Sequence, residues 1–220
     1  MSQSHRLPDG GRIDRSRSLS FLFDGNRYEG HPGDTLASAL IANGVHLVGR
    51  SFKYHRPRGI FSAGSEEPNA LIQLGLGNHT EPNLRAPQIE LYDGLVATSQ
   101  NRFPSLAFDL GEVNDIAAPL IPSGFYYKTF MWPKRGWMSY ERAIRRMAGL
   151  GRAPDGPDPD TYEHRHAHCD VLVAGGGVTG LAAALAAGRA GARVILAVEQ
   201  AEMGGWLLSE GDGETGTRIS

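Results

Sequence analysis

Three glycines in the last quarter of the chain have the spacing of a dinucleotide-binding turn. Gly175, Gly177 and Gly180 form the pattern G-x-G-x-x-G directly after a short apolar run at residues 171–174. In such a turn the first glycine permits a sharp bend, the second lets a pyrophosphate approach the backbone, and the third lets the following helix pack closely on the strand. Free N–H groups at the start of that helix face the phosphates. The spacing therefore predicts a dinucleotide site.

A carboxylate closes the same unit. The second apolar run, residues 194–198, ends in Glu199, and Gly204 and Gly205 follow shortly after it. An acidic side chain at the end of the second strand can accept hydrogen bonds from an adenosine ribose. Together these residues indicate a strand–helix–strand unit that binds either FAD or NAD. The alternative is the same unit without a ligand.

Other groups of reactive side chains give weaker signals. His164, His166 and His168 alternate just before Cys169, but no carboxylate or second thiol joins them, so we expect a solvated linker rather than a metal site. No nucleophile and base stand in a context such as G-x-S-x-G. The sequence therefore predicts no catalytic residue and no metal ligand in this chain.

The elements at the start of the chain follow the order of a β-grasp, ferredoxin-like domain. Strands at residues 19–23 and 27–30, separated by a turn at residues 24–26, predict a hairpin. A helix is expected next, with Asp34 as its N-cap and Gly44 at its end. The expected buried face of this helix consists of Leu36, Ala39 and Leu40.

Shorter apolar runs predict the remaining elements of this domain. Strands are expected at 45–48 and 70–74, and a second hairpin is expected from strands at 89–92 and 95–98 around Asp93–Gly94. A helix at 140–148, with Ser139 as its N-cap and Gly149 after its end, would complete the domain.

The loop after the first helix lacks the ligands of an iron–sulfur cluster. Plant-type ferredoxins carry C-x4-C-x2-C in this loop, whereas residues 49–64 contain no cysteine, and Cys169 is the only cysteine of the chain. We therefore expect a ferredoxin-like domain without its cluster. The same loop contains a basic segment, Arg50–Gly59, which is interpreted either as an anion-binding or subunit-docking loop or as a solvated basic loop.

Composition and charge exclude several classes of protein. The 220 residues are 40% hydrophobic and 21% charged, and the net charge of −2 gives no overall basic field for nucleic acid. No apolar stretch is long enough to span a membrane, and the polar N-terminus lacks the core of a signal peptide. One cysteine excludes an internal disulfide. These features predict a cytoplasmic protein that binds neither nucleic acid nor membrane.

The expected fold class is α+β followed by α/β. We expect a flexible arm at 1–17, a β-grasp ferredoxin-like domain at 18–150, a Pro/Gly/Asp-rich linker at 151–168, and the start of a Rossmann dinucleotide-binding domain at 169–220. Such a domain needs about five or six strands, and only two are predicted in this last segment. The chain is therefore expected to be the N-terminal part of a longer protein.

Several segments resemble one family. The runs SFKYHRPRGI at 51–60, EEPNALI at 66–72 and FYYKTFMWP at 125–133, together with the glycine motif, are similar to the α subunits of heterotetrameric sarcosine oxidases. The resemblance covers about residues 6–210 and only the N-terminal part of those subunits. Subunits of amine, opine and proline dehydrogenases and of hydrogen cyanide synthase share parts of it.

The resemblance implies a function for the whole complex. It implies oxidation of sarcosine by oxygen to glycine and hydrogen peroxide, with FAD on a β subunit, FMN at the α–β boundary, and tetrahydrofolate handled by a C-terminal region of the α subunit. It also implies β, γ and δ subunits as partners, and NAD in the dinucleotide region. This chain alone is expected to be inactive. The NAD contacts carried over by position are Gly175, Gly177, Val178, Thr179, Gly180, Val198, Glu199, Gln200, Gly205 and Trp206.

Two alternatives stay open. The first is a subunit of a related amine, opine or proline dehydrogenase. The second is a non-catalytic docking module, in which residues 1–150 bind a partner and the dinucleotide-binding half is a remnant.

Overall fold

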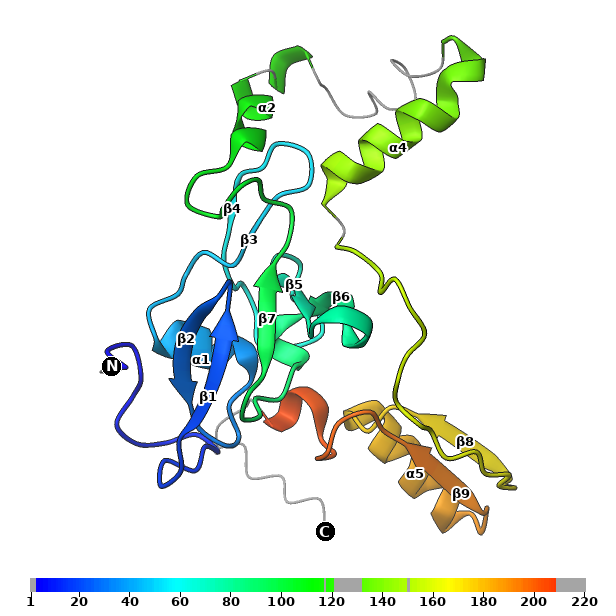
Figure 1. Cartoon of the computed structure of the whole chain (residues 1–220). Helices are drawn as coiled ribbons and strands as arrows, with labels where there is room; N and C mark the ends of the chain where they lie inside the picture. Colours follow the sequence, from blue (N-terminus) through cyan, green and yellow to red (C-terminus); the bar gives the residue numbers. More distant parts are fainter. Residues whose placement is uncertain (1–2, 117, 121–131, 150, 209–220) are drawn as a thin grey trace.

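A computed structural model of the protein describes residues 3–116, 118–120, 132–149 and 151–208 (Figure 1). Most of the FYYKTFMWP segment, residues 125–131, and the tail at 209–220 lie outside the described residues. Among the described residues, no helix combines the length and apolar character needed to cross a membrane.

The first domain is built on a mixed five-stranded sheet (Figure 1). Its strand order is β2-β1-β7-β5-β6, with β1 parallel to β7 and the other neighbours antiparallel. This arrangement confirms the ferredoxin-like β-grasp expectation. The strands are β1 (Leu19–Phe23), β2 (Asn26–Gly30), β5 (Leu71–Leu74), β6 (Glu81–Arg85) and β7 (Val96–Ser99).

The hairpin between β1 and β2 turns on two residues. Asp24 and Gly25 have φ values of 49° and 79°, and positive φ at both central positions is the mark of a type I′ turn. That turn matches the right-handed twist of the strands and pairs Phe23 with Asn26. The Asp-Gly signal in the sequence therefore predicted the turn correctly.

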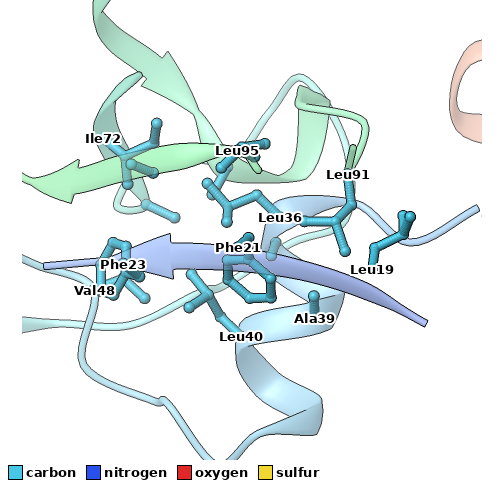
Figure 2. Packing of buried hydrophobic residues seen from close by; sticks show 14 residues of the cluster. Leu19, Phe21, Phe23, Leu36, Ala39, Leu40, Val48, Ile72, Leu91 and Leu95 are labelled. Carbon is cyan, nitrogen blue, oxygen red and sulfur yellow. The ribbon is translucent and has the colours of Figure 1, made fainter. Parts of the chain in front are cut away.

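Helix α1 (Leu36–Ala42) covers one face of the sheet and forms the core with it (Figure 2). Leu36 and Leu40 lie against Phe21 of β1, and all three are buried. Burying each such side chain contributes about 1.5–3 kcal/mol. The predicted buried face of α1 is confirmed.

The expected N-cap of α1 was wrong by one residue. Thr35 is the N-cap, and its hydroxyl and that of Ser38 form a reciprocal capping box. The carboxylate of Asp34 is instead buried and accepts hydrogen bonds from Arg6, at 2.7 and 3.0 Å, and from the His31 N–H at 2.9 Å. Asp34 therefore fixes the N-terminal arm to the domain.

Two predicted strands are absent from the described residues. Residues 45–48 form no strand; the chain pairs just after them, where β3 (Gly49–Arg50) meets β4 (Pro57–Arg58). Residues 89–92 form no hairpin with β7, because their backbone binds the start of α1: the Leu36 N–H donates to Ile89 O at 2.8 Å. β7 therefore pairs in parallel with β1 and not with residues 89–92.

The remaining helical elements of this part of the chain lie between the strands or after them. The helix predicted at 140–148 begins earlier: α4 spans Trp137–Ala148 and follows Gly136, with no side-chain cap from Ser139. Gly149 ends it in the left-handed conformation, as predicted. The others are η1 (Gly77–His79), η2 (Ala86–Gln88), η3 (Leu110–Glu112), α2 (Val113–Ile116), η4 (Ala118–Leu120) and η5 (Lys134–Gly136).

The last described segment is a strand–helix–strand unit. β8 (Val171–Ala174), α5 (Val178–Arg189) and β9 (Val194–Ala197) follow one another, and β8 pairs with β9 in parallel. The 3-10 helix η6 (Gly205–Leu208) comes after them. Residues 151–169 carry no helix or strand (Figure 1). The limits of the domains stay predictions.

Candidate functional site

The glycine motif forms the turn between β8 and α5. Gly175 has a φ of 105°, which favours glycine, and its N–H donates to Ala197 O at 2.7 Å. Gly177 is the N-cap residue of α5 and has no side chain with which to cap the helix. The N–H groups of the first helical turn therefore have no side-chain cap, as an anion-binding helix start requires.

The second and third glycines have different steric surroundings. A Cβ at Gly177 would meet no protein atom within 4 Å. A Cβ at Gly180 would lie 1.9 Å from Gly175 O. Gly180 therefore serves the packing of α5 on the turn, whereas Gly177 leaves open space where a ligand could approach the backbone.

A second pair of glycines closes against this turn. The N–H of Gly204 donates to Gly176 O at 2.8 Å, and a Cβ at Gly205 would lie 3.1 Å from Gly177 Cα. Sequence reasoning named Gly205 as a contact residue but did not include Gly204 or Gly176. The available signal was that Gly176 stands between two motif glycines and that Gly204 directly precedes Gly205.

The other predicted cofactor contacts differ in their position and exposure around the turn. Val198 lies directly over it, because a Cβ at Gly176 would meet its side chain at 2.6 Å. Val178 and Thr179 begin α5. Glu199 and Gln200 follow β9 and are exposed, and Trp206 in η6 is half-exposed. The arrangement leaves a carboxylate accessible at the end of β9, as ribose binding requires.

We predict that Gly180→Ala destabilises the strand–helix–strand unit by about 1–3 kcal/mol, because the added methyl group would overlap the Gly175 carbonyl. Gly188→Ala on the same helix is the matched control, since a Cβ there meets nothing within 4 Å. Hydrogen exchange of the β8 and β9 amides in the full-length protein measures the effect. Equal exchange in the two variants would contradict the prediction.

The basic segment is a hairpin with two buried side chains, those of Arg50 and His55. The guanidinium of Arg50 donates to Leu106 O and, at 3.0 Å, to His55 O, and it lies 3.4 Å from a carboxylate oxygen of Glu112. His55 is also buried, and its Nδ1 donates to Asp109 at 2.6 Å. Both side chains hold the hairpin to the segment after β7 and are structural.

The tip of the hairpin is partly neutralised. Arg56 donates to Asp115 at 2.7 Å, and this hydrogen bond raises the pKa of Arg56. Arg56 and Lys53 each lie 4.8 Å from the centre of the Tyr54 ring. Because Arg50 and Arg56 both have acidic partners, the geometry argues against a strong anion site at these two residues.

One surface group was missed by sequence reasoning. His79, Asp158 and Asp160 offer ligand atoms within 4.8 Å of one another, and all three are exposed. Asp158 also accepts a hydrogen bond from Tyr162, which raises the pKa of the Tyr162 hydroxyl to about 12. The group has the chemistry of a weak cation site, although exposed acidic groups of this kind are common without an ion.

The ferredoxin-like domain does not fit an iron–sulfur cluster. Such clusters are held by cysteine thiolates, and the sheet domain contains no cysteine. Cys169 lies just before β8, beyond the sheet domain in the chain. The cluster-free expectation therefore agrees with the donor atoms that the chain supplies.

Comparison with known proteins first defines the class of the sheet domain. Residues 16–102 match the family described as the 2Fe-2S iron-sulfur cluster binding domain. This range contains the whole five-stranded sheet and α1. Residues 16–102 therefore fit a ferredoxin-like domain.

The relatives of the whole chain are sarcosine oxidase alpha subunits. Identity is 62% over 208 residues to the subunit of Rhizobium meliloti strain 1021, and 38% over 221 and 213 residues to those of Corynebacterium strains U-96 and P-1. These matches cover 94%, 97% and 94% of this chain. The chain is thus homologous to a portion of the sarcosine oxidase alpha subunits, in agreement with the expected N-terminal part.

The match covers only a small share of each relative. The chain spans about a fifth of the length of these curated relatives, at 21%, 18% and 18%. Among solved structures, the L-proline dehydrogenase of P. horikoshii aligns with 90% of this chain and 28% of its own, at 20% identity and a TM-score of 0.42. A likeness at that level carries no argument about function.

Proposed function

We propose that the chain is the N-terminal part of the NAD-binding alpha subunit of a sarcosine oxidase-type flavoprotein complex. The observation that carries the proposal is the 62% identity over 94% of the chain to a sarcosine oxidase alpha subunit. The reaction of the complex would be the oxidative demethylation of sarcosine to glycine, with hydrogen peroxide as the reduced product. By the resemblance to these subunits, the substrate would be oxidised at FAD on the β subunit.

The glycine turn supports a bound dinucleotide, and the resemblance implies that it is NAD. An uncapped helix start at Gly177, open space above that residue and an exposed Glu199 at the end of β9 suit a pyrophosphate and a ribose. NAD would be held here by the turn from Gly175 to Gly180 and by Val198 to Gln200, with Gly205 and Trp206 on the other side.

The rest of the complex belongs to the same proposal. FAD and FMN would be bound mainly by the β subunit, and tetrahydrofolate by a further region of the alpha subunit. The β, γ and δ subunits would complete a heterotetramer in the cytoplasm. The basic hairpin (residues 49–58) keeps an exposed Phe52 for contacts in such an assembly.

The test is co-expression of the full-length alpha subunit with its partner subunits. We expect a complex with flavin absorbance and extractable NAD that releases hydrogen peroxide when sarcosine is added. Turnover of L-proline or an opine in place of sarcosine would support the related dehydrogenases instead. A full-length protein that binds partners but contains no dinucleotide would support the docking module.

A further inference from the structure

A buried carboxylate lies in the loop between β4 and β5. Glu67 is 1% exposed. One of its oxygens accepts the N–H groups of Phe61 and Ser62, each at 2.6 Å. The other accepts the N–H groups of Asn69 and Ala70, at 2.7 and 3.1 Å. A single side chain thus binds both ends of residues 61–70.

The surroundings keep this carboxylate ionised. Burial, the largest influence, raises the pKa of Glu67, but hydrogen bonds from the backbone of Ser62, Asn69, Phe61 and Ala70 together lower it below its usual value. The Nε of Arg85 donates to the backbone carbonyl of Glu67 at 3.1 Å. An ionised acceptor forms stronger hydrogen bonds than a neutral one.

The spacing of the residues that meet at this carboxylate is that of a cluster loop. Plant-type ferredoxins carry C-x4-C-x2-C, and the same spacing in this loop falls on Ser62, Glu67 and Ala70. Glu67 accepts the N–H groups of the other two. The range 49–64, in which the sequence analysis sought cluster ligands, includes the first of these three positions but not the other two.

We propose that the Glu67 carboxylate replaces the iron–sulfur cluster as the anion that orders this loop. The cluster positions are filled by a hydroxyl, a carboxylate and a methyl group, and only the carboxylate carries charge. The backbone N–H groups that converge on Glu67 then have a permanent internal acceptor. This inference goes beyond the proposed function, because it requires neither NAD nor a particular substrate.

The test compares Glu67→Gln with Glu66→Gln in the full-length protein. Glu66 is the adjacent, exposed residue and serves as the matched control. In Glu67→Gln the new amide nitrogen would face two donors, so we expect the amides of residues 61, 62, 69 and 70 to exchange roughly ten- to a hundredfold faster. Glu66→Gln should exchange like the wild type. Unchanged protection of these four amides in Glu67→Gln would overturn the proposal.

The wild-type protein provides a second test that does not depend on a variant folding. Because the folded pKa of Glu67 lies below the unfolded value of about 4.3, its stabilisation is present above that pH and is lost as pH falls through the folded pKa. The nearby charged groups are Arg85 and Glu66. We expect the loop amides to lose protection on acidification before those of β1. If the loop amides stayed protected to as low a pH as those of β1, the proposal would be overturned. Stoichiometric iron in the purified protein would also overturn it.

Discussion

Replacing Gly177 by alanine is expected to abolish most NAD binding by the full-length protein while leaving its fold intact. Gly177 has a φ of −75° and a ψ of −177°, which alanine adopts without strain. The new methyl group meets no protein atom within 4 Å, so it would project into the space that a pyrophosphate needs. We expect NAD affinity to fall about 10- to 100-fold, since such overlap costs about 1–3 kcal/mol.

Gly188→Ala is again the matched control, because it also adds a methyl group to an open position on α5. It should leave NAD affinity unchanged and stabilise the helix by about 1 kcal/mol. Isothermal titration of both variants with NAD, alongside hydrogen exchange of β8 and β9, separates loss of binding from loss of structure. Wild-type affinity in Gly177→Ala would refute the assigned role of the turn.

The second large effect is expected from Asp109→Ala. The buried carboxylate of Asp109 accepts hydrogen bonds from His55 at 2.6 Å and from the N–H groups of Phe103 and Gly111 at 3.0 Å each. Removing it would leave one buried donor, on His55, and two part-buried backbone donors without an acceptor, at a cost of about 3–5 kcal/mol. We expect the basic hairpin and residues 103–111 to open locally, which hydrogen exchange of their amides measures.

Asp115→Ala is the control for this variant. Asp115 pairs with Arg56 on the surface of the same hairpin, and exposed pairs contribute little to stability. In Asp115→Ala, the amides of the basic hairpin and of residues 103–111 should therefore exchange like those of the wild type. If Asp115→Ala opened the hairpin as much as Asp109→Ala, the hairpin would depend on its tip and not on the buried His55–Asp109 contact.

Much of the sheet domain could be predicted because its signals are local. The Asp24–Gly25 turn and the alternating strands beside it need only neighbouring residues to form. The strand expected at 89–92 was wrong because a short apolar run does not reveal its partner. Its backbone binds the start of α1, which is distant in the chain.

In the candidate site too, features set by neighbouring residues were predictable, and features set by distant contacts were not. Gly175, Gly177 and Gly180 lie in one turn between β8 and α5, so their spacing was sufficient to predict that turn, and the binding of a dinucleotide there stays a prediction. The burial of Arg50 was not predictable from charge, because its guanidinium is satisfied by a carbonyl at Leu106. Glu67 could have been found only by extending the search for cluster spacing to residues other than cysteine.

The replacement of a cluster by Glu67 bears on the chemistry that surrounds such a subunit. Low-pKa thiolates are the side chains that peroxide oxidises most readily, and the proposed complex releases hydrogen peroxide. A loop ordered by a carboxylate presents no sulfur to that product, and it requires no metal delivery during biosynthesis. In the proposed complex, the ferredoxin-like domain would therefore offer the oxidant no cluster thiolate to attack.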